Sequence, residues 1–505
     1  MAPDLKPALV FIGFMAAGKS TAAREAAAAL GVPADDTDAL LEARLGAPIE
    51  AIFDRDGEAV FRAAESELAT KLLDTADGGV IALGGGALQS GEVRAALDRH
   101  TVVLVDVDLD TAWKRAHDHG RPLARDRADF EARYHARAPV YDAAARAVVP
   151  GTRTRSVRDA LPALQAIPEG HRLLWATSAS GDYPVWVGPI ERAPWPQGGR
   201  LIVVSDQTVA GLHGARVPGA AGHIEIPAGE GHKTLQTAER VWHALVAQGA
   251  TRADRVVALG GGVVGDLAGF CAATYQRGIG VVQVPTTLVA QVDSAYGGKT
   301  GVDLPEAKNY VGAYHQPVAV LTDPALLQTL PAAELAAGYA EVVKTALIAG
   351  GPLWDRIARG DALDEDVIAA CARTKLRVVA ADERDGGARQ VLNLGHTVGH
   401  AIETATGYAR YRHGEAVALG LLAALRLSGQ DALREVVGEL LRGAGLPTRL
   451  EGVDPEAVAA ATARDKKRTG GAVPFVLVEA PGRVTPGHAV GAAELVSAVR
   501  ELCPP

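Results

Sequence analysis

Short apolar runs alternate with longer segments of helical periodicity in the first third of the chain. The runs 8–13, 80–83 and 101–107 have the length and composition of buried strands. The segments between them space their apolar residues as amphipathic helices do. Strands that alternate with helices predict right-handed crossovers and a parallel sheet with helices on both faces.

A second series of strands follows a polar stretch, 167–172, whose Pro and Gly predict a linker. The predicted strands of this series lie within 172–190 and at 201–206, 255–259, 279–285 and 318–323. After about residue 331 the pattern becomes mostly helical to about 465, with one late strand at 473–478. We therefore predict an α/β protein whose domains are residues 1–166, an α/β part over 173–330 and a mostly α-helical part over 331–505.

Composition narrows the classes of protein to which the chain can belong. Of its 505 residues, 48% are hydrophobic and 22% are charged, which is typical of a globular protein and excludes global disorder. The net charge of −9 lacks the positive excess that a sequence-independent grip on nucleic acid needs. The apolar runs are too short to span a membrane, and no signal-peptide pattern precedes them. We expect a cytoplasmic protein that binds neither nucleic acid nor membranes.

A phosphate-binding loop is predicted between the first strand and the first helix. The segment Gly13-Phe-Met-Ala-Ala-Gly18-Lys19-Ser20 fits the pattern G-x-x-x-x-G-K-[ST]. Glycines let backbone N–H groups turn toward phosphate oxygens, and the following helix adds the favourable end of its dipole. Lys19 is placed to reach the outer phosphates and Ser20 to hold Mg²⁺.

Other polar residues of this domain have both a catalytic and a plain structural interpretation. The two aspartates of 36–38 lie in a predicted extended segment, so one can serve a metal and one a substrate, or both can form a solvated turn. Arg62 and Glu65, three apart on a helix, taken alone predict a surface ion pair. Glycines 84–86 allow a ligand to approach the backbone or simply make a tight turn. The polar stretch 121–125 is a candidate lid or a surface loop.

Together these motifs resemble shikimate kinase over residues 8 to about 165. The match includes the phosphate loop, Asp36-Thr-Asp38, Asp56-Gly57-Glu58, Phe61-Arg62, Glu65, the glycine triplet, Arg121-Pro-Leu and Arg137-Ala-Pro-Val-Tyr141. The resemblance implies transfer of a phosphoryl group from ATP to the 3-hydroxyl of shikimate, with Mg²⁺. Ala16 is a departure, because the family usually has glycine there.

The resemblance also assigns individual roles in this domain. The catalytic residues would be Lys19, Asp38 as the base, and Arg121 on the lid. The implied ATP-binding residues are Gly13, Ala16, Ala17, Gly18, Lys19, Ser20, Thr21 and Arg121. Those implied for Mg²⁺ are Ser20 and Asp36, and those for shikimate are Asp38, Arg62, Gly84, Gly85, Gly86 and Arg137.

The second half contains a weak dinucleotide signal and a stronger metal signal. Gly260-Gly-Gly-Val-Val-Gly265 fits G-x-G-x-x-G after a strand, but the acid that usually binds ribose further along is missing, since residue 280 is glycine. His396 and His400 lie four apart on one helical face, and His413 follows. From spacing alone we pair His396 with His400 as ligands of Zn²⁺ or a similar ion. The three cysteines contain no Cys-x-x-Cys pair, which argues against a thiolate site.

Lysines in unusual surroundings point to an anionic substrate. Lys299 and Lys308 lie in Gly-rich, apolar sequence, whereas most lysines are simply solvated. A phosphate group on the substrate would explain them.

This half resembles 3-dehydroquinate synthase from about Arg172 to the C-terminus. The match includes Gly260 to Asp266, Arg277-Gly, Pro285-Thr-Thr287, Asp293-Ser, Gly297-Gly-Lys299-Thr-Gly, Lys308-Asn309, Glu341-Val-Val-Lys344, Asp382-Glu-Arg, Asn393-Leu-Gly-His396, His400, His413-Gly-Glu and Asp465-Lys-Lys467. The implied reaction cyclises 3-deoxy-D-arabino-heptulosonate 7-phosphate to 3-dehydroquinate and releases phosphate. The implied cofactors are NAD⁺, reduced and re-oxidised within one cycle, and Zn²⁺ or Co²⁺, which polarises the reacting oxygen.

The same resemblance assigns the residues of this second site. The implied metal ligands are Glu341, His396 and His413. This set replaces the pair derived from spacing, and the resemblance gives His400 a role beside the ligands or in proton transfer instead. With His400, the implied catalytic residues are Lys344 and Asp385, where the family more often has Glu. The implied NAD-binding residues are Asp206, Glu230, Lys233, Gly261, Gly262, Val263, Thr286, Thr287, Lys308 and Thr329. The residues implied for the heptulosonate phosphate are Asp266, Arg277, Asp293, Lys299, Asn309, Lys375, Arg389, Asn393, His396 and one or both of Lys466 and Lys467.

The leading hypothesis is thus a bifunctional enzyme with two activities of the shikimate pathway, which leads to chorismate and the aromatic amino acids. One alternative keeps the second fold but makes it another sugar-phosphate cyclase. Another makes the N-terminal domain a non-catalytic binding module, and a glycerol-dehydrogenase-like oxidoreductase is a further possibility. By likeness to the synthases we expect small-molecule substrates and a homodimer formed through the second half.

Overall fold

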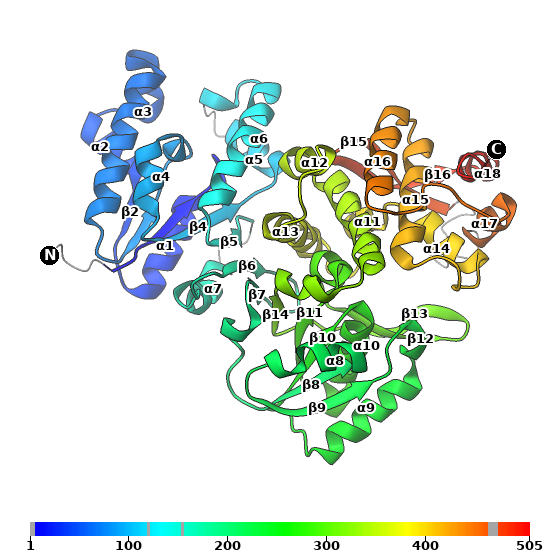
Figure 1. The fold of residues 1–505 in the computed structure, drawn as a ribbon. Coiled ribbons are helices and arrows are strands. Elements are labelled where there is room, and N and C mark those ends of the chain that lie inside the picture. The colour runs from blue at the N-terminus through cyan, green and yellow to red at the C-terminus, as the bar shows by residue number, and fades with distance from the viewer. Residues whose placement is uncertain (1–5, 119–121, 153–155, 463–472, 505) are drawn as a thin grey trace. The chain divides into compact units, whose positions relative to one another are not determined.

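The computed structural model describes residues 6–118, 122–152, 156–462 and 473–504. The chain divides into two compact units (Figure 1). The first comprises Met1–Thr177 with Pro184–Trp186, and the second comprises Ser178–Tyr183 with Val187–Pro505. None of the helices among the described residues is both long and apolar enough to cross a membrane.

The first unit is built on a parallel sheet with strand order β2-β3-β1-β4-β5-β6, which confirms the predicted α/β class. Its strands are β1 (Leu9–Ile12), β2 (Ala34–Asp36), β3 (Val80–Ala82), β4 (Thr101–Asp106), β5 (Ala147–Pro150) and β6 (Arg172–Ala176). Its helices are α1 (Lys19–Leu30), α2 (Thr37–Leu45), α3 (Ile49–Thr75), α4 (Gly91–Leu97), α5 (Leu109–Asp118), α6 (Arg127–Ala144) and α7 (Ser156–Gln165). Because the central strands are parallel, the segments that follow β1, β2 and β3 meet at one edge of the sheet. These segments carry the phosphate loop, Asp36 and the glycine triplet.

The second unit begins with five parallel strands in the order β14-β11-β10-β8-β9. Its strands are β8 (Leu201–Asp206), β9 (Ala220–Ile226), β10 (Arg255–Gly260), β11 (Gly280–Pro285) and β14 (Ala319–Thr322). The strand β7 (Tyr183–Val187) precedes them in the chain, and its central residues, Pro184–Trp186, belong to the first unit. The associated helices are α8 (Gln207–His213), α9 (Leu235–Ala247) and α10 (Gly262–Thr274). An antiparallel hairpin of β12 (Lys299–Leu304) and β13 (Ala307–Tyr314) carries Lys299, Lys308 and Asn309. The sequence pattern did not predict this hairpin.

The remainder of the second unit is mostly helical, as predicted. Its helices are α11 (Ala332–Ala349), α12 (Gly351–Ala358), α13 (Glu365–Ala381), α14 (His396–Ala405), α15 (His413–Leu427), α16 (Asp431–Gly443), α17 (Pro455–Thr462) and α18 (Ala492–Arg500). The late strand β15 (Val473–Ala480) pairs antiparallel with β16 (Arg483–Val490). The core lies around α11 and α15, whose central residues are buried on all sides. Such burial fixes both helices, and each carries a predicted metal ligand, Glu341 on α11 and His413 on α15.

Candidate active sites

The phosphate loop of the first unit connects β1 to α1 in the conformation that an anion site needs. Gly13 has φ 147°, and a methyl group there would lie 2.7 Å from the carbonyl oxygen of Val105. Gly18 has φ 100° and ends the loop where α1 begins at Lys19, so Ser20 and Thr21 lie in the first turn. No side chain caps this helix, which leaves its first N–H groups for an anion. The Lys19 ammonium donates to the carbonyl oxygen of Phe14 at 3.1 Å, across the loop.

Ala16 adopts the left-handed backbone conformation, with φ 59°. Adopting this left-handed conformation costs a residue with a side chain roughly 1–2 kcal/mol, whereas glycine adopts it at little cost. The departure from the family at this position is therefore a strained residue within the loop itself. Its neighbour Ala17 is fully buried.

We expect Ala16→Gly to stabilise the kinase-like unit by about 1 kcal/mol, because relief of the strain exceeds the extra entropy of the unfolded chain. The measurement is calorimetric unfolding of the full chain, following the transition that ATP shifts. Ala17→Gly is the matched control and should lower that transition, since it removes a buried methyl group. An unchanged or lower transition for Ala16→Gly would show that the loop carries no such strain.

The aspartates of 36–38 do not both lie in an extended segment, so that expectation was wrong. Asp36 ends β2 and caps α2, where its carboxylate accepts from the N–H of Asp38 at 3.0 Å. Asp38 lies in the first turn of α2. Its Oδ1 would be 2.6 Å from a methyl group on Gly84, so the absence of a side chain at Gly84 leaves room beside this carboxylate.

Arg62 and Glu65 are not the surface ion pair that their spacing alone predicts. Arg62 Nη1 donates to Glu65 Oε2 at 2.6 Å, and Glu65 is only 2% exposed. Burial raises the pKa of the Glu65 carboxyl, although Arg62 opposes that shift. A side chain at Gly86 would overlap the Arg62 guanidinium. The guanidinium of Arg62, which extends from α3, therefore packs directly against the backbone of the glycine triplet.

Arg137 approaches the same triplet from α6. Its Nη1 donates to the carbonyl oxygen of Gly85 at 2.7 Å, and the Tyr141 hydroxyl donates to that oxygen at 2.6 Å. The structure thus brings Asp38, Arg62 and Arg137 around one glycine triplet at the sheet edge that bears the phosphate loop. Of the residues that the kinase resemblance implies, Arg121 lies outside the described residues.

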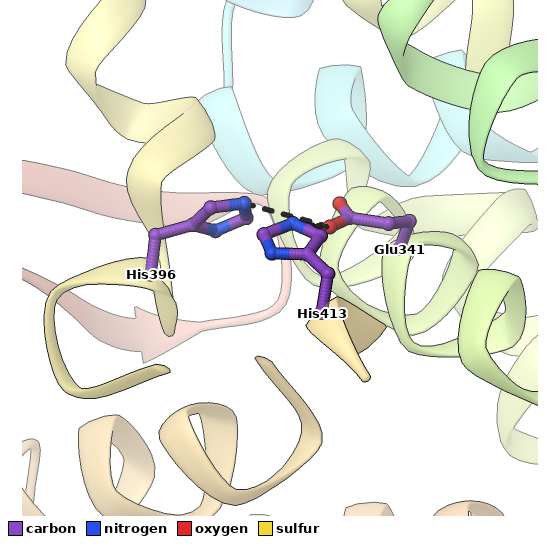
Figure 2. A group of neighbouring side chains, drawn as sticks. All are labelled: Glu341, His396 and His413. Carbon is purple, nitrogen blue, oxygen red and sulfur yellow. Dashed lines mark ion pairs between the residues drawn. The ribbon is translucent and has the colours of Figure 1, made fainter. Parts of the chain in front are cut away.

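In the second unit, Glu341, His396 and His413 point toward one another (Figure 2). Glu341 Oε1 lies 3.4 Å from His396 Nε2 and 3.5 Å from His413 Nε2. The donor atoms of the three side chains all lie within 4.8 Å of one another. Two imidazoles and one carboxylate are a donor set that Zn²⁺ accepts while keeping a position open, so these residues fit the implied metal.

The electrostatics of this cluster also suit a cation. Burial would raise the pKa of the Glu341 carboxyl, but Lys344 and the histidines hold it well below its usual range. Burial lowers the pKa of His396 to about 3, which keeps its imidazole in the neutral, metal-binding form. Its Nδ1 lies 3.1 Å from the carbonyl oxygen of Leu394, which leaves Nε2 for a metal.

His396 and His400 do not lie in one group of donors, although they share a helix. His400 is exposed and instead lies with Glu403 and His413, whose donor atoms are within 4.8 Å of its own. The rings of His400 and His413 are 5.9 Å apart. Burial opposes the charge of His413, but the facing carboxylates of Glu341 and Glu403 raise its pKa to about 9. The pair of ligands derived from spacing is therefore wrong in this geometry, since Glu341 takes the place of His400.

A chain of buried charges runs from the metal cluster into the predicted substrate site. Lys344 Nζ lies 2.5 Å from Glu341 Oε2 and 2.5 Å from Asp293 Oδ2. Lys375 pairs with the other oxygen of Asp293. Burial would raise the pKa of Asp293, but the two lysines lower it to about 2. Alternating charges of this kind can orient hydroxyl and phosphate oxygens next to a metal.

Two further pairs hold residues that the synthase resemblance assigns to the substrate. Lys299 Nζ lies 2.8 Å from Asp385 Oδ2, and Asp385 has φ 62°. Lys233 Nζ donates to Asn309 Oδ1 at 2.6 Å and to Asp266 Oδ2 at 3.2 Å. Burial raises the pKa of Asp266 to about 6, against the effect of Lys233.

The other implied substrate residues lie in different environments. Arg389 is 1% exposed, and its guanidinium donates to the carbonyl oxygens of Gly297 and Glu383. Arg277 is exposed at φ 70°, and Asn393 is half-buried just before α14. Lys466 and Lys467 lie outside the described residues.

The glycine motif after β10 forms a cradle that fits a dinucleotide. A methyl group on Gly261 would lie 2.8 Å from the Thr287 methyl, and one on Gly262 would lie 3.0 Å from Ser294 Oγ. The hydroxyls of Thr286 and Ser294 are buried and have no hydrogen-bond partner among the described residues. Val263 lies in the first turn of α10, which no side chain caps. Room, unpaired hydroxyls and an open helix N-terminus are what a pyrophosphate requires.

The remaining residues assigned to NAD lie in different parts of the second unit. Asp206 caps α8 through the N–H groups of Thr208 and Val209. Glu230 pairs with Lys233 at 3.2 Å. The other two assigned residues contact side chains of helices. The Thr329 hydroxyl lies 2.8 Å from Nε2 of His213 on α8, and Lys308 Nζ lies 3.3 Å from Oε1 of Glu403 on α14.

Known proteins match both halves of the chain. The family model for the 3-dehydroquinate synthase N-terminal domain matches residues 223–337, and the model for its C-terminal domain matches 338–468. A 3-dehydroquinate synthase of Halorhodospira halophila is 45% identical over 333 residues, which are 62% of this chain and 94% of that protein. The chain belongs to the 3-dehydroquinate synthase family. A second relative, from Symbiobacterium thermophilum, is 44% identical and covers 60% of this chain and 92% of its own length.

The rest of this family member is a kinase domain. The shikimate kinase model matches residues 15–168. A 3-dehydroquinate synthase with a shikimate kinase domain at its N-terminus is a bifunctional enzyme of the shikimate pathway. This finding confirms the leading hypothesis from the sequence.

Solved structures support the fold of the synthase part. A 2-epi-5-epi-valiolone synthase of Streptomyces hygroscopicus with NAD⁺ and Zn²⁺ bound is 28% identical, with a TM-score of 0.59, and the match covers 65% of this chain and 99% of that one. A 2-deoxy-scyllo-inosose synthase with carbaglucose-6-phosphate, NAD⁺ and Co²⁺ is 26% identical, with a TM-score of 0.59 over 65% and 99% of the two chains. Both neighbours carry the two cofactors that the synthase resemblance implies.

Three residues of the two sites were missed as site residues in the sequence. Tyr141 and Glu65 support the glycine triplet of the kinase domain, and Glu403 faces the metal cluster of the synthase. Glu403 had a usable signal, because it follows His400 by three residues on the same helix. Tyr141 and Glu65 belonged to the motifs of the resemblance without an assigned role.

Proposed function

We propose that residues 1–166 phosphorylate the 3-hydroxyl of shikimate, and that residues 173–505 convert 3-deoxy-D-arabino-heptulosonate 7-phosphate to 3-dehydroquinate. Within the synthase, residues 173–330 hold the dinucleotide and residues 331–505 hold the metal and much of the substrate. The observation that carries the second assignment is the Glu341, His396 and His413 cluster, which Lys344 joins to Asp293.

In the kinase domain, the chain's residues position the acceptor and neutralise charge. ATP with Mg²⁺ supplies the phosphoryl group when bound. The N–H groups of the phosphate loop and Lys19 hold the phosphates, while Ser20 and Asp36 offer oxygens to the cation. Arg62 and Arg137 bind the shikimate carboxylate beside the glycine triplet, and Asp38 takes the proton of the attacking hydroxyl. Arg121, which lies outside the described residues, neutralises the transferred group.

In the synthase, the chain's residues hold the substrate and move protons. When bound, NAD⁺ exchanges a hydride with the substrate and Zn²⁺ polarises the substrate oxygen. Glu341, His396 and His413 hold the metal, and the cradle at Gly261 and Gly262 holds the dinucleotide. Lys344 and Lys375, oriented by Asp293, bind substrate oxygens, and the Lys299–Asp385 pair borders the same substrate. His400 exchanges the proton near the metal.

The substrate of the synthase part is tested by comparing two sugar phosphates on the full chain. With NAD⁺ and Zn²⁺ present, we expect release of phosphate from the heptulosonate phosphate at least about 100-fold faster than from sedoheptulose 7-phosphate, because a site built to bind a polar group rejects an analogue that lacks it, and the second sugar phosphate has no carboxylate. Comparable rates, or a preference for sedoheptulose 7-phosphate, would make this part another sugar-phosphate cyclase.

We also propose that the protein acts as a homodimer through its synthase part and in the cytoplasm, on small molecules rather than on nucleic acid or membranes. The net charge of −9 supports the last point, because it disfavours polyanionic partners. Light scattering of the purified chain tests the dimer, and a mass of one chain of 52.2 kDa would contradict it.

A further inference from the structure

Glu403 lies next to His413 of the proposed metal site, and no role has been assigned to it so far. It sits on α14 and is 3% exposed. Its Oε2 lies 3.5 Å from His413 Nδ1, and its Oε1 lies 3.3 Å from Lys308 Nζ. A carboxylate this deeply buried needs partners for both oxygens, and these two side chains supply them.

His413 is held between two carboxylates on opposite sides of its ring. Nε2 faces Glu341 Oε1 at 3.5 Å, and Nδ1 faces Glu403 at the same distance. An imidazole that binds a metal through Nε2 carries its proton on Nδ1. A carboxylate that accepts this proton fixes the ring and makes Nε2 a stronger donor. His396 differs, because its Nδ1 faces a backbone carbonyl, that of Leu394.

We propose that Glu403 is a positioning residue for the synthase metal, which accepts the Nδ1–H of His413 and so directs Nε2 at the ion. This inference rests on the proposed metal site of Glu341, His396 and His413. Lys308 completes the arrangement from the other side of the carboxylate. Its ammonium lies 4.4 Å from the centre of the Tyr408 ring, so it is held by a cation–π contact as well as by Glu403. Because Lys308 belongs to β13, the carboxylate of Glu403 links the β12–β13 hairpin to His413, one of the proposed metal ligands.

The same donors offer a competing arrangement. His400, Glu403 and His413 form a second group whose donor atoms lie within 4.8 Å of one another. A second ion there would use Nδ1 of His413 as a ligand, so Glu403 would be a ligand and not a positioning residue. The number of ions bound distinguishes the two arrangements.

The experiment is a zinc titration of the metal-free full chain in competition with a chromophoric chelator. The parent should bind one equivalent at the synthase site. We expect Glu403→Gln and Glu403→Asp each to weaken Zn²⁺ binding about 10- to 100-fold. Glutamine removes the negative charge, and the shorter aspartate moves its carboxylate away from the His413 ring. Glu501→Gln is the matched control: it also removes a glutamate held by two cations, Arg426 and Arg434 at 2.9 Å each, and should leave the affinity unchanged.

A second readout separates positioning from folding. The metal-free Glu403→Gln protein should keep the circular dichroism spectrum of the parent, even if loss of the buried charge lowers its unfolding temperature, whereas the absorption bands of its Co²⁺ form should shift. If the Glu403→Gln variant fails to fold, the Glu403→Asp variant provides the same test. Unchanged zinc affinity in a folded variant would overturn the inference, as would a second equivalent of zinc that both Glu403→Gln and His400→Ala abolish. If Glu341→Gln does not weaken binding either, the proposed metal site itself is wrong.

Discussion

Replacing Lys19 with methionine is expected to lower shikimate kinase turnover by about a thousandfold and leave the synthase rate unchanged. The ammonium lies at the phosphate loop, and removing one preorganised cation from a transferring phosphoryl group has an effect of this order. The synthase rate should persist because its assigned residues all lie in the second unit. Initial rates of both reactions in one preparation measure the difference.

The control for this prediction is Lys71→Met, which removes an exposed lysine of α3. It should leave both rates within twofold of the parent. If Lys19→Met retained full shikimate-dependent release of ADP, the N-terminal domain would not use its phosphate loop for catalysis. If the parent showed no such release, the domain would be a binding module.

Removing the metal should abolish the synthase activity and leave the kinase activity intact, the reverse of the Lys19→Met result. A transition-metal chelator, added with Mg²⁺ in excess, is expected to lower the synthase rate by at least about a thousandfold while the kinase rate is kept. Glu341→Gln should behave in the same way, because it takes the carboxylate from between the two histidines. Added Zn²⁺ should restore the chelated parent but only weakly restore the variant.

Glu334→Gln is the matched control for Glu341→Gln, since it changes an exposed glutamate on the same helix, α11. Its zinc content and both rates should equal those of the parent. A metal-free synthase that keeps its rate would contradict the role given to Glu341, His396 and His413. A loss of kinase activity on chelation with Mg²⁺ in excess would contradict the separation of the two sites.

The fold class and the phosphate loop could be predicted from sequence because their signals are local. The loop is one contiguous segment between a strand and a helix, and the parallel sheet follows from buried apolar runs such as 101–107. The strand β2 was missed because it is three residues long and contains two aspartates. The hairpin β12–β13 was missed because its polar, Gly-containing sequence lacks an apolar strand face.

The metal cluster could not be derived from spacing because its members come from three helices. Glu341 on α11 reaches His396 and His413 only through the packing of α11, α14 and α15. A pattern along one helix can combine only residues of that helix, such as His396 with His400, and the structure instead groups His396 with Glu341 and His413. Resemblance to the family provided the set that the geometry brings together. The spacing also marked Glu403 on the same helix, but only the structure shows which histidine its carboxylate faces.

In the kinase domain, burial was the property that sequence could not supply. Spacing gave Arg62 and Glu65 as a surface pair, but the approach of α3 to the glycine triplet buries Glu65. At Ala16 the sequence showed only that alanine stands where the resembled family usually has glycine, and the left-handed φ was seen in the structure alone.

The claim that one polypeptide carries two working active sites is tested most directly by assaying both reactions across a single size-exclusion peak of the purified full chain. We expect shikimate-dependent release of ADP and heptulosonate-dependent release of phosphate to elute together, in a constant ratio to the protein concentration. A ratio that varies across the peak, or the lack of either activity, would contradict it.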